Sequence, residues 1–269
     1  MTIPQEVLGS RRMIGSLARN DFKRKFAGSY LGIIWAFVQP VVTVFVYWFV
    51  FEKALHAGTQ GTKAGITVPY VLWLIAGLVP WFYFSDAVNA GTRALLDYSY
   101  LVKKVVFKIS ALPVVKVISS LFVHLFFIAF TLVMYAVYHF RPTLYMLQIL
   151  YYSIAMILIV TAIVYWTSSI VIFFRDLQQI VNIVLQIGVW FTPIMWNIDA
   201  MQLPGWVMTL LKLNPMFYIV MGYRDALIND VWFWQRPGLT AYFWILTVLL
   251  MIGGMRTFRK LQPHFADVM

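Results

Sequence analysis

Long apolar stretches dominate this sequence and restrict what it can fold into. They follow one another along the 269-residue chain, and a helix needs about 20 such residues to cross the hydrocarbon core of a bilayer. The stretches are continuous and do not alternate in polarity, which favours helices over the strands of a membrane barrel. We therefore predict an all-α integral membrane protein with six transmembrane helices, at residues 32–51, 69–90, 112–138, 144–174, 180–196 and 239–255.

The composition also favours a membrane protein. Hydrophobic residues make up 62% of the chain and charged residues 12%, whereas soluble domains average about 45–50% and about 25%. A net charge of +11 would suggest nucleic acid in a soluble protein, but here Lys and Arg cluster beside the apolar stretches, as the positive-inside rule describes. We expect no nucleic-acid partner. The chain has no cysteine, which excludes disulfides, thiolate catalysis and Cys-ligated metals.

The distribution of Lys and Arg predicts the orientation. If both termini are cytoplasmic, 14 of the 21 basic residues face the cytoplasm, six face outward and Lys116 lies within the third span. Residues 1–30 lack the continuous apolar core of a cleavable signal peptide, so we expect the first span to direct insertion. The prediction is a multi-pass protein of the cell membrane with both termini cytoplasmic.

Three regions are expected: residues 1–30, a transmembrane domain at 31–262 and a cytoplasmic tail at 263–269. In the first, basic and apolar residues alternate at roughly helical spacing, which predicts an amphipathic helix lying on an anionic membrane surface. A solvated leader that only sets topology is the alternative. The cations of residues 1–30 could attract a diphosphate headgroup, or they could act only by setting the topology and binding anionic lipid. The nearest candidates for headgroup attraction are Arg19, Lys23, Arg24 and Lys25.

The connection 197–237 contains two apolar pieces, at 206–213 and 216–228, separated by Asn214-Pro215. Each piece is too short to span a bilayer. Two short re-entrant helices in the outer leaflet and two packed loop helices fit the sequence equally well.

The motifs of catalysis are missing. The sequence has no G-x-x-x-x-G-K-S/T phosphate-binding loop, no H-E-x-x-H and no acidic pair closer than Asp225 and Asp230. We predict no catalytic residue, no metal site and no cofactor in this chain. Among polar residues in the spans, Asp86 and Lys116 are expected to snorkel to the interface and His124 to pack between helices through one hydrogen bond. Few buried carboxylates are expected, which disfavours ion-coupled transport.

Aromatic residues make up 18% of the chain. Most are expected in interfacial belts or in packing, but aromatic faces also pack against sugar rings. The candidates for lining a sugar path are Trp35, Trp73, Trp81, Phe84, Trp190 and Tyr218.

Four segments, in this order, resemble a known family. They read DFKRKFAGSYLGIIWAFVQP at 21–40, YLVKKVVFKISALPV at 100–114, FFRDLQQIVNIVLQIGVWFTPIMW at 173–196 and LNPMFYIVMGYRDALI at 213–228. The chain is similar to the type-2 ABC exporter permeases for teichoic acid, O-antigen and capsular polysaccharide. It departs at 107–109, where FKI stands in place of the usual Phe-Pro.

This resemblance implies a homodimer bound to two copies of a separate ABC ATPase, which holds ATP and Mg. It implies a coupling helix near 95–106, with Leu96, Tyr98, Tyr100, Leu101, Lys103 and Lys104 at the matching positions. It also implies outer gate helices within 204–230, including Asn214, Pro215, Tyr223 and Arg224.

The implied substrate is a polyprenyl-diphosphate-linked polysaccharide. The stretch KLNPMFYIVMGYRDALI at 212–228 most resembles the teichoic-acid members, and export of O-antigen or capsular polysaccharide is the alternative. Two other functions stay open: a membrane-embedded enzyme acting on lipid-linked sugar, and a type-2 permease for a small molecule.

Overall fold

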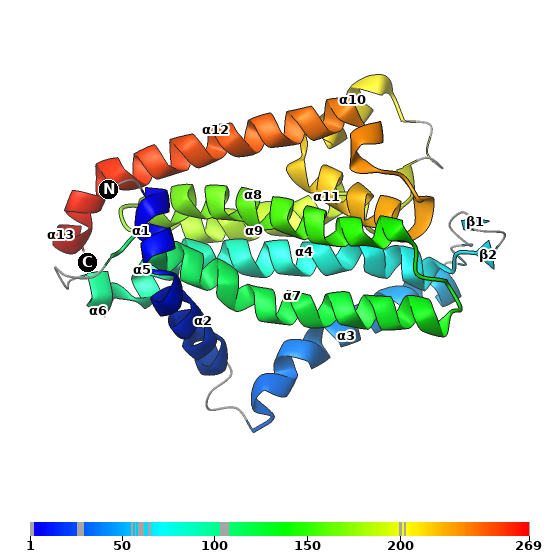
Figure 1. The fold of residues 1–269 in the computed structure, drawn as a ribbon, viewed down its shortest axis with the longest axis horizontal. Coiled ribbons are helices and arrows are strands. Elements are labelled where there is room, and N and C mark those ends of the chain that lie inside the picture. The colour runs from blue at the N-terminus through cyan, green and yellow to red at the C-terminus, as the bar shows by residue number, and fades with distance from the viewer. Residues whose placement is uncertain are drawn as a thin grey trace.

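The computed structural model describes residues 3–25, 30–54, 56, 58, 62–63, 66–102, 108–198, 201 and 203–268. Nearly all of this part of the chain is helical (Figure 1), and the prediction of an all-α membrane protein is confirmed. The exception is a small antiparallel hairpin of two-residue strands, β1 (Thr62–Lys63) and β2 (Ile66–Thr67).

Within the described residues, five helical segments are long and apolar enough to cross a membrane: Gly32–Ala54, Tyr70–Thr92, Ala111–Val137, Leu144–Ile170 and Pro237–Val268. The first consists of a 3-10 turn (Gly32–Ile34), α3 (Trp35–Trp48) and a π-helical turn (Phe49–Ala54). The next three contain α4 (Tyr70–Thr92), α7 (Ala111–Val137) and α8 (Gln148–Ile170), the last after a 3-10 turn (Leu144–Leu147). The fifth begins with α12 (Pro237–Leu261). All five coincide with predicted spans.

The predicted fifth span is a shorter helix, α9 (Leu177–Phe191), of 15 residues. At 1.5 Å per residue it is roughly 22 Å long, less than the hydrocarbon core of about 30 Å. The prediction that this helix extends to residue 196 is wrong. The backbone becomes extended at Thr192, because Pro193 has no N–H to donate and disfavours helical geometry in the residue before it. A sixth crossing therefore remains a prediction.

Helix α4 lies at the centre of the bundle and packs against α7, α8 and α11 (Pro215–Arg224). Its most apolar window is 83% buried, against 11% for the α3 segment and 17% for the α12 segment. A helix that is hydrophobic all round is a core helix, whereas α3 and α12 lie at the edges of the bundle (Figure 1).

Helices α8 and α12 approach closely because two glycines leave room for an indole ring. A Cβ atom on Gly253 would come within 2.5 Å of the Trp166 ring, and Gly254 is similarly crowded. The Trp166 indole N–H donates to the Leu250 carbonyl at 2.8 Å. Small residues of this kind let membrane helices pack backbone to backbone.

Both termini lie at one end of the bundle (Figure 1). This end carries α1 (Ile3–Gly9), α2 (Arg11–Lys25), α5 (Ala94–Asp97), α6 (Ser99–Val102) and α13 (Phe265–Val268). An apolar cluster ties α1, α5, α6 and α13 to α7, α8 and α12, and its members include Ile3, Leu95, Val102, Leu112, Phe258 and Phe265. A 3-10 turn (Gln262–His264) leads into α13, so the last residues dock on the bundle.

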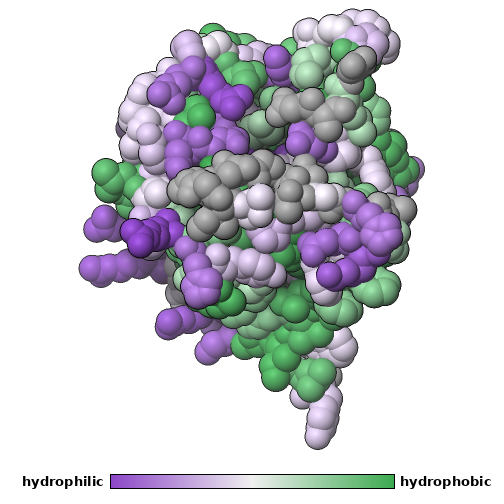
Figure 2. Space-filling view, turned by 90° about the vertical axis from the view of Figure 1, so that its right-hand side faces the viewer, coloured by the Kyte–Doolittle hydropathy of each residue, from purple (hydrophilic) through white to green (hydrophobic). Residues whose placement is uncertain are grey.

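The opposite end carries the hairpin and α10 (Gly205–Leu213), with α11 extending toward it (Figure 1). Figure 2 faces this end, where hydrophilic side chains gather over much of the surface and hydrophobic ones lie below them. Eight of the ten residues of α11 are buried, so this helix is inserted among the spans and is not a surface loop. It continues into a π-helical turn (Asp225–Asn229), and a 3-10 turn (Phe233–Gln235) precedes α12.

Candidate functional site

Helix α2 is held against the membrane helices by two sets of charges. The first is buried: the Lys116 ammonium lies 2.7 Å from Asp21 and 3.0 Å from Asp97. The Tyr98 hydroxyl also donates to Asp21, at 2.7 Å. The prediction that Lys116 snorkels to the interface is wrong. Its side chain is 11% exposed, because carboxylates from α2 and α5 neutralise it inside the protein.

The second set lies at the end of α2. Lys25 forms an ion pair with Asp86 of α4, whose other oxygen accepts a hydrogen bond from Ser120 of α7 at 2.6 Å. The Lys25 and Asp86 side chains are about two-fifths exposed, so this pair borders open space. The other predicted headgroup cations, Arg19, Lys23 and Arg24, lie on the exposed face of α2. Ile14 and Ala18 on its opposite face pack on Ala111 and Val115 of α7.

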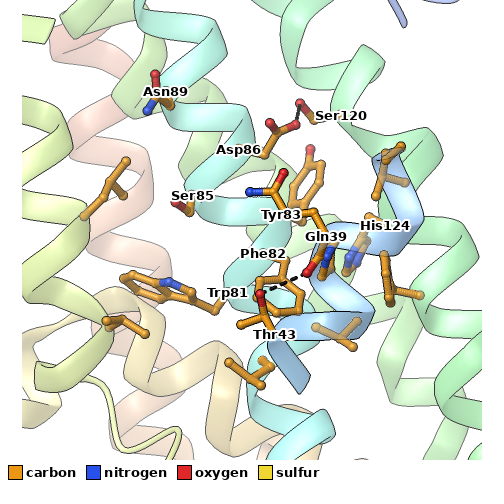
Figure 3. Close-up of a pocket in the computed structure, with 18 of the residues that line it drawn as sticks. Gln39, Thr43, Trp81, Phe82, Tyr83, Ser85, Asp86, Asn89, Ser120 and His124 are labelled. Carbon is orange, nitrogen blue, oxygen red and sulfur yellow. Dashed lines mark hydrogen bonds between the residues drawn. The ribbon is translucent and has the colours of Figure 1, made fainter. Parts of the chain in front are cut away.

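A groove of about 870 Å³ opens beside this pair. Helices α3, α4, α7 and α9 form its walls, and Lys25 and Asp86 lie on its border. Figure 3 shows the polar side chains of this space, from Asn89 and Asp86 at one end to Thr43 at the other. The groove is amphipathic: Trp81, Phe82 and Phe127 line it together with carboxamides and hydroxyls. A smaller cavity of about 340 Å³ continues from Asp86 to Arg24 and Lys116.

Carboxamides from two helices form a network at one edge of the groove. Asn89 of α4 donates to Asn182 of α9 at 2.7 Å, and Gln178 donates to Asn89 at 2.7 Å. The side-chain oxygen of Gln178 is buried and has no hydrogen-bond partner among the described residues. Gln186, one helical turn beyond Asn182, lies exposed in the groove. One face of α9 is therefore polar, although the helix is otherwise apolar.

Helix α11 is fixed at the other end by a buried cation. The Arg224 guanidinium donates to the carbonyls of Pro193 at 2.5 Å and Ile194 at 2.8 Å. Its central carbon lies 3.4 Å from the centre of the Trp73 ring. These contacts hold the extended chain after α9 against α11 and α4.

Asn214 caps the same helix. Its side-chain oxygen accepts from the Met216 amide at 3.0 Å, and its amide group donates to Thr192 at 2.8 Å. Pro215 occupies the first helical turn, where a missing N–H costs nothing. Further along α11, the Tyr223 hydroxyl contacts His124 at 3.0 Å and Ser153 at 2.7 Å. The prediction that His124 packs between helices through a hydrogen bond is confirmed.

Comparison with known proteins identifies the family. Residues 12–228 match the family described as ABC-2 type transporter. The chain belongs to this membrane transporter family. It is also 25% identical over 256 residues to an O-antigen export system permease protein of Klebsiella pneumoniae, with 94% of this chain and 93% of that protein covered. An O-antigen export system permease protein of Myxococcus xanthus is 26% identical over 263 residues, covering 98% and 97%.

The segment that was predicted to be a coupling helix does not form a single helix in its described part. A single helix was expected near 95–106, but the described part contains two four-residue helices, α5 and α6, broken at Tyr98. Tyr98 is buried, and burial together with its hydrogen bond to Asp21 raises its pKa. Tyr100 is 52% exposed, and Leu96 and Leu101 are half-buried. Lys103 and Lys104 lie outside the described residues.

The six aromatic candidates divide into two groups in the ABC-2 fold. Trp35, Trp81 and Trp190 line the groove. Trp73, Phe84 and Tyr218 are buried in the core. Trp73 packs on Arg224, and Tyr218 stacks on Phe243 with ring centres 4.7 Å apart.

Sequence reasoning missed the polar lining of the groove, which includes Gln39, Ser85, Asn89, Asn182 and Gln186. One signal was present: Gln178, Asn182 and Gln186 recur every four residues in an apolar stretch, the spacing of one helix face. Among the described residues no three His, Asp or Glu side chains come together as metal ligands would.

Proposed function

We propose that this chain is the membrane subunit of an ATP-driven exporter that moves polyprenyl-diphosphate-linked polysaccharide across the cell membrane. The groove is the observation that carries the proposal. Its polar and aromatic side chains face a space open to one side, and polar groups at membrane depth are costly unless they face one another or a polar path. The relatives of this chain that are named as O-antigen export permeases support polysaccharide as the substrate class.

The energy would come from a separate subunit. The sequence has no phosphate-binding loop, so we infer two copies of an ABC ATPase that hold ATP and Mg. The exposed surface of α5 and α6, at the end that carries both termini, would receive them, and this end would be cytoplasmic. A second copy of the permease would cover the open side of the groove. Movement of the ATPases would then shift the helices between two arrangements.

Substrate entry would begin at the charged end of α2. Lys25 lines both cavities and Arg24 lines the smaller one, and cations bind diphosphate through charge-assisted hydrogen bonds. Arg19 and Lys23 would add attraction at the surface. A diphosphate would compete with Asp86 for Lys25. Asn214, Pro215, Tyr223 and Arg224 would hold the outer gate.

Affinity purification from the native membrane in mild detergent tests the exporter proposal. We expect an ABC ATPase at one copy per permease. A chain recovered alone, in a detergent that preserves known exporters, would contradict the two-subunit proposal. Turnover of a lipid-linked sugar by that chain without ATP would favour a membrane enzyme.

Teichoic acid and O-antigen are two candidate cargoes for the same path. The motif at 212–228 favours teichoic acid, whereas the relatives' names favour O-antigen. Deletion of the gene followed by chemical analysis of the surface polymer distinguishes them: loss of a phosphate-rich polymer supports the first, and loss of a phosphate-free polysaccharide the second. Unchanged surface polymers with altered drug sensitivity would instead favour a small-molecule permease.

A further inference from the structure

The lining of the groove is rich in uncharged hydrogen-bonding groups. Residues with carboxamide or hydroxyl side chains come from all four of its walls: Gln39 and Thr43 on α3, Ser85 and Asn89 on α4, Ser120 on α7, and Asn182 and Gln186 on α9. The side chains of Gln39, Ser85 and Gln186 make no hydrogen bond to any residue that the structure describes. They are therefore available to a molecule in the groove.

The groove has almost no net charge. Lys25 and Asp86 are its only Lys, Arg, Asp or Glu lining residues within the described chain, and they pair with each other at its border. A phosphodiester inside would lose water and would have to compete with Asp86 for Lys25, which is costly for a desolvated charge. A chain of phosphodiesters would meet this cost at every repeat.

Carboxamides match sugar hydroxyls better than they match phosphates. A hydroxyl both donates and accepts a hydrogen bond, and so does a carboxamide, with one oxygen and one NH₂ group. On α9, Gln178 to Gln186 span eight residues, roughly 12 Å of helix. Trp35 and Trp190 line the groove and are exposed, so their indoles supply flat apolar faces. Hydroxyls would thus bond to the amide row while ring faces pack on the indoles.

We propose that the amide row of the groove, centred on Asn89, Asn182 and Gln186, is a subsite for uncharged sugar units, so that this permease takes a neutral glycan in preference to a poly(alditol phosphate). This inference rests on the proposed export function, because it assigns the groove to the cargo. Hydrogen bonds within the row keep Asn89 and Asn182 in place, and Gln186 on the next turn faces the groove.

Binding to the full-length chain in lipid nanodiscs tests the subsite. The probes are maltoheptaose, a neutral heptasaccharide, and a glycerol phosphate oligomer of the same length, compared by saturation-transfer NMR. We expect maltoheptaose to bind more tightly. Asn182→Leu and Gln186→Leu should each weaken its binding by roughly 2- to 12-fold, the value of one hydrogen bond. Gln262→Leu makes the same change in the 3-10 turn after α12, outside the groove lining, and should leave binding unchanged.

A charge variant sharpens the test. Gln186→Lys should weaken maltoheptaose binding and strengthen binding of the glycerol phosphate oligomer, because it adds a cation to the amide row, which has none. Tighter binding of the phosphate oligomer to the unmodified chain would overturn the proposal, as would maltoheptaose binding that neither Leu variant affects. Failure of the export function would appear separately, as a chain that binds maltoheptaose but purifies without an ATPase.

Discussion

Arg224 is a cation buried among apolar helices, with 3% of its surface exposed. Its environment explains how it is accommodated. Two carbonyls left free after α9 accept hydrogen bonds from its guanidinium, and the Trp73 ring covers the face of the guanidinium. The carbonyls of Pro193 and Ile194 need a donor because the chain is not helical there. At the residue scale, Arg224 and the α9 break therefore depend on each other.

Replacing Arg224 with Lys keeps the charge but loses the planar fork that reaches both carbonyls. Because hydrogen bonds from charged groups are worth about 1.5–3 kcal/mol each, we expect the melting temperature of the purified protein to fall by roughly 4–10 °C. Thermal unfolding in detergent measures this. Arg141→Lys, at an exposed site, is the matched control. Equal melting temperatures of the two variants would contradict the role of Arg224 in holding the chain after α9 against α11.

The Lys116 cluster gives a second prediction at this scale. Lys116→Met removes the cation that Asp21 and Asp97 share, and breaking the buried pair with Asp21 costs about 3–5 kcal/mol. The charge swap Asp21→Lys with Lys116→Asp should recover part of that loss. Denaturant unfolding of the single and double variants measures both.

The control for this cluster is Arg93→Met. Arg93 also contacts Asp97, at 3.8 Å, but its side chain is 57% exposed. An exposed pair is worth about 1 kcal/mol or less, so this variant should be close to neutral. If Lys116→Met lowered the free energy of unfolding as little as Arg93→Met does, the buried cluster would not anchor α2.

At the element scale, α5 and α6 combine an inner and an outer face within eight helical residues. Tyr98 is bonded to Asp21 of α2, whereas Tyr100 faces solvent. Lys116 of α7 contacts the same Asp21. A force on the exposed face would thus reach α2 and α7 through buried polar contacts, which makes this segment a rigid transmitter in the proposed mechanism.

Charged substitutions test this transmitter. Tyr100→Asp and Leu101→Asp should abolish export and recovery of the ATPase while leaving membrane insertion intact, because both residues are at least partly exposed. Export and co-purification are measured in the same cells. Tyr98→Phe, which keeps the ring and loses only the bond to Asp21, should retain ATPase binding. Normal export by the Asp variants would place the ATPase elsewhere.

At the scale of the whole molecule, the two ends of the bundle differ in composition and role. One end gathers both termini and the basic helix α2, and the other carries the hairpin and α10 (Figure 1). With six crossings, the 14-to-6 bias of basic residues predicts that the first end is cytoplasmic.

The absence of cysteine makes this orientation directly testable. Single cysteines at Leu8, Trp234 and Val268 replace exposed side chains. In intact cells, a membrane-impermeant maleimide should label the cysteine at 234 and spare those at 8 and 268, and permeabilised cells should label all three. The opposite pattern would invert the topology, and labelling of 8 and 234 alike would require an even number of crossings between them.

The spans could be predicted from sequence because the bilayer acts locally. About 20 apolar residues must follow one another wherever a helix crosses, so the α4, α7 and α8 segments were located to within a few residues except at the end of α8. The break after α9 was also present in the sequence, in Thr192-Pro193, but its effect was underestimated. The break between α5 and α6 at Tyr98 is not marked by a proline in the sequence.

The groove and its ion pairs were decided only by tertiary structure. Asp21 and Lys116 are 95 positions apart, and no local pattern says which of several carboxylates a buried cation will meet. Trp73 and Trp190 look alike in sequence, yet one lies in the core under Arg224 and the other in the groove. Hydropathy records how apolar a segment is, whereas the direction that each side chain faces depends on how helices distant in sequence pack together.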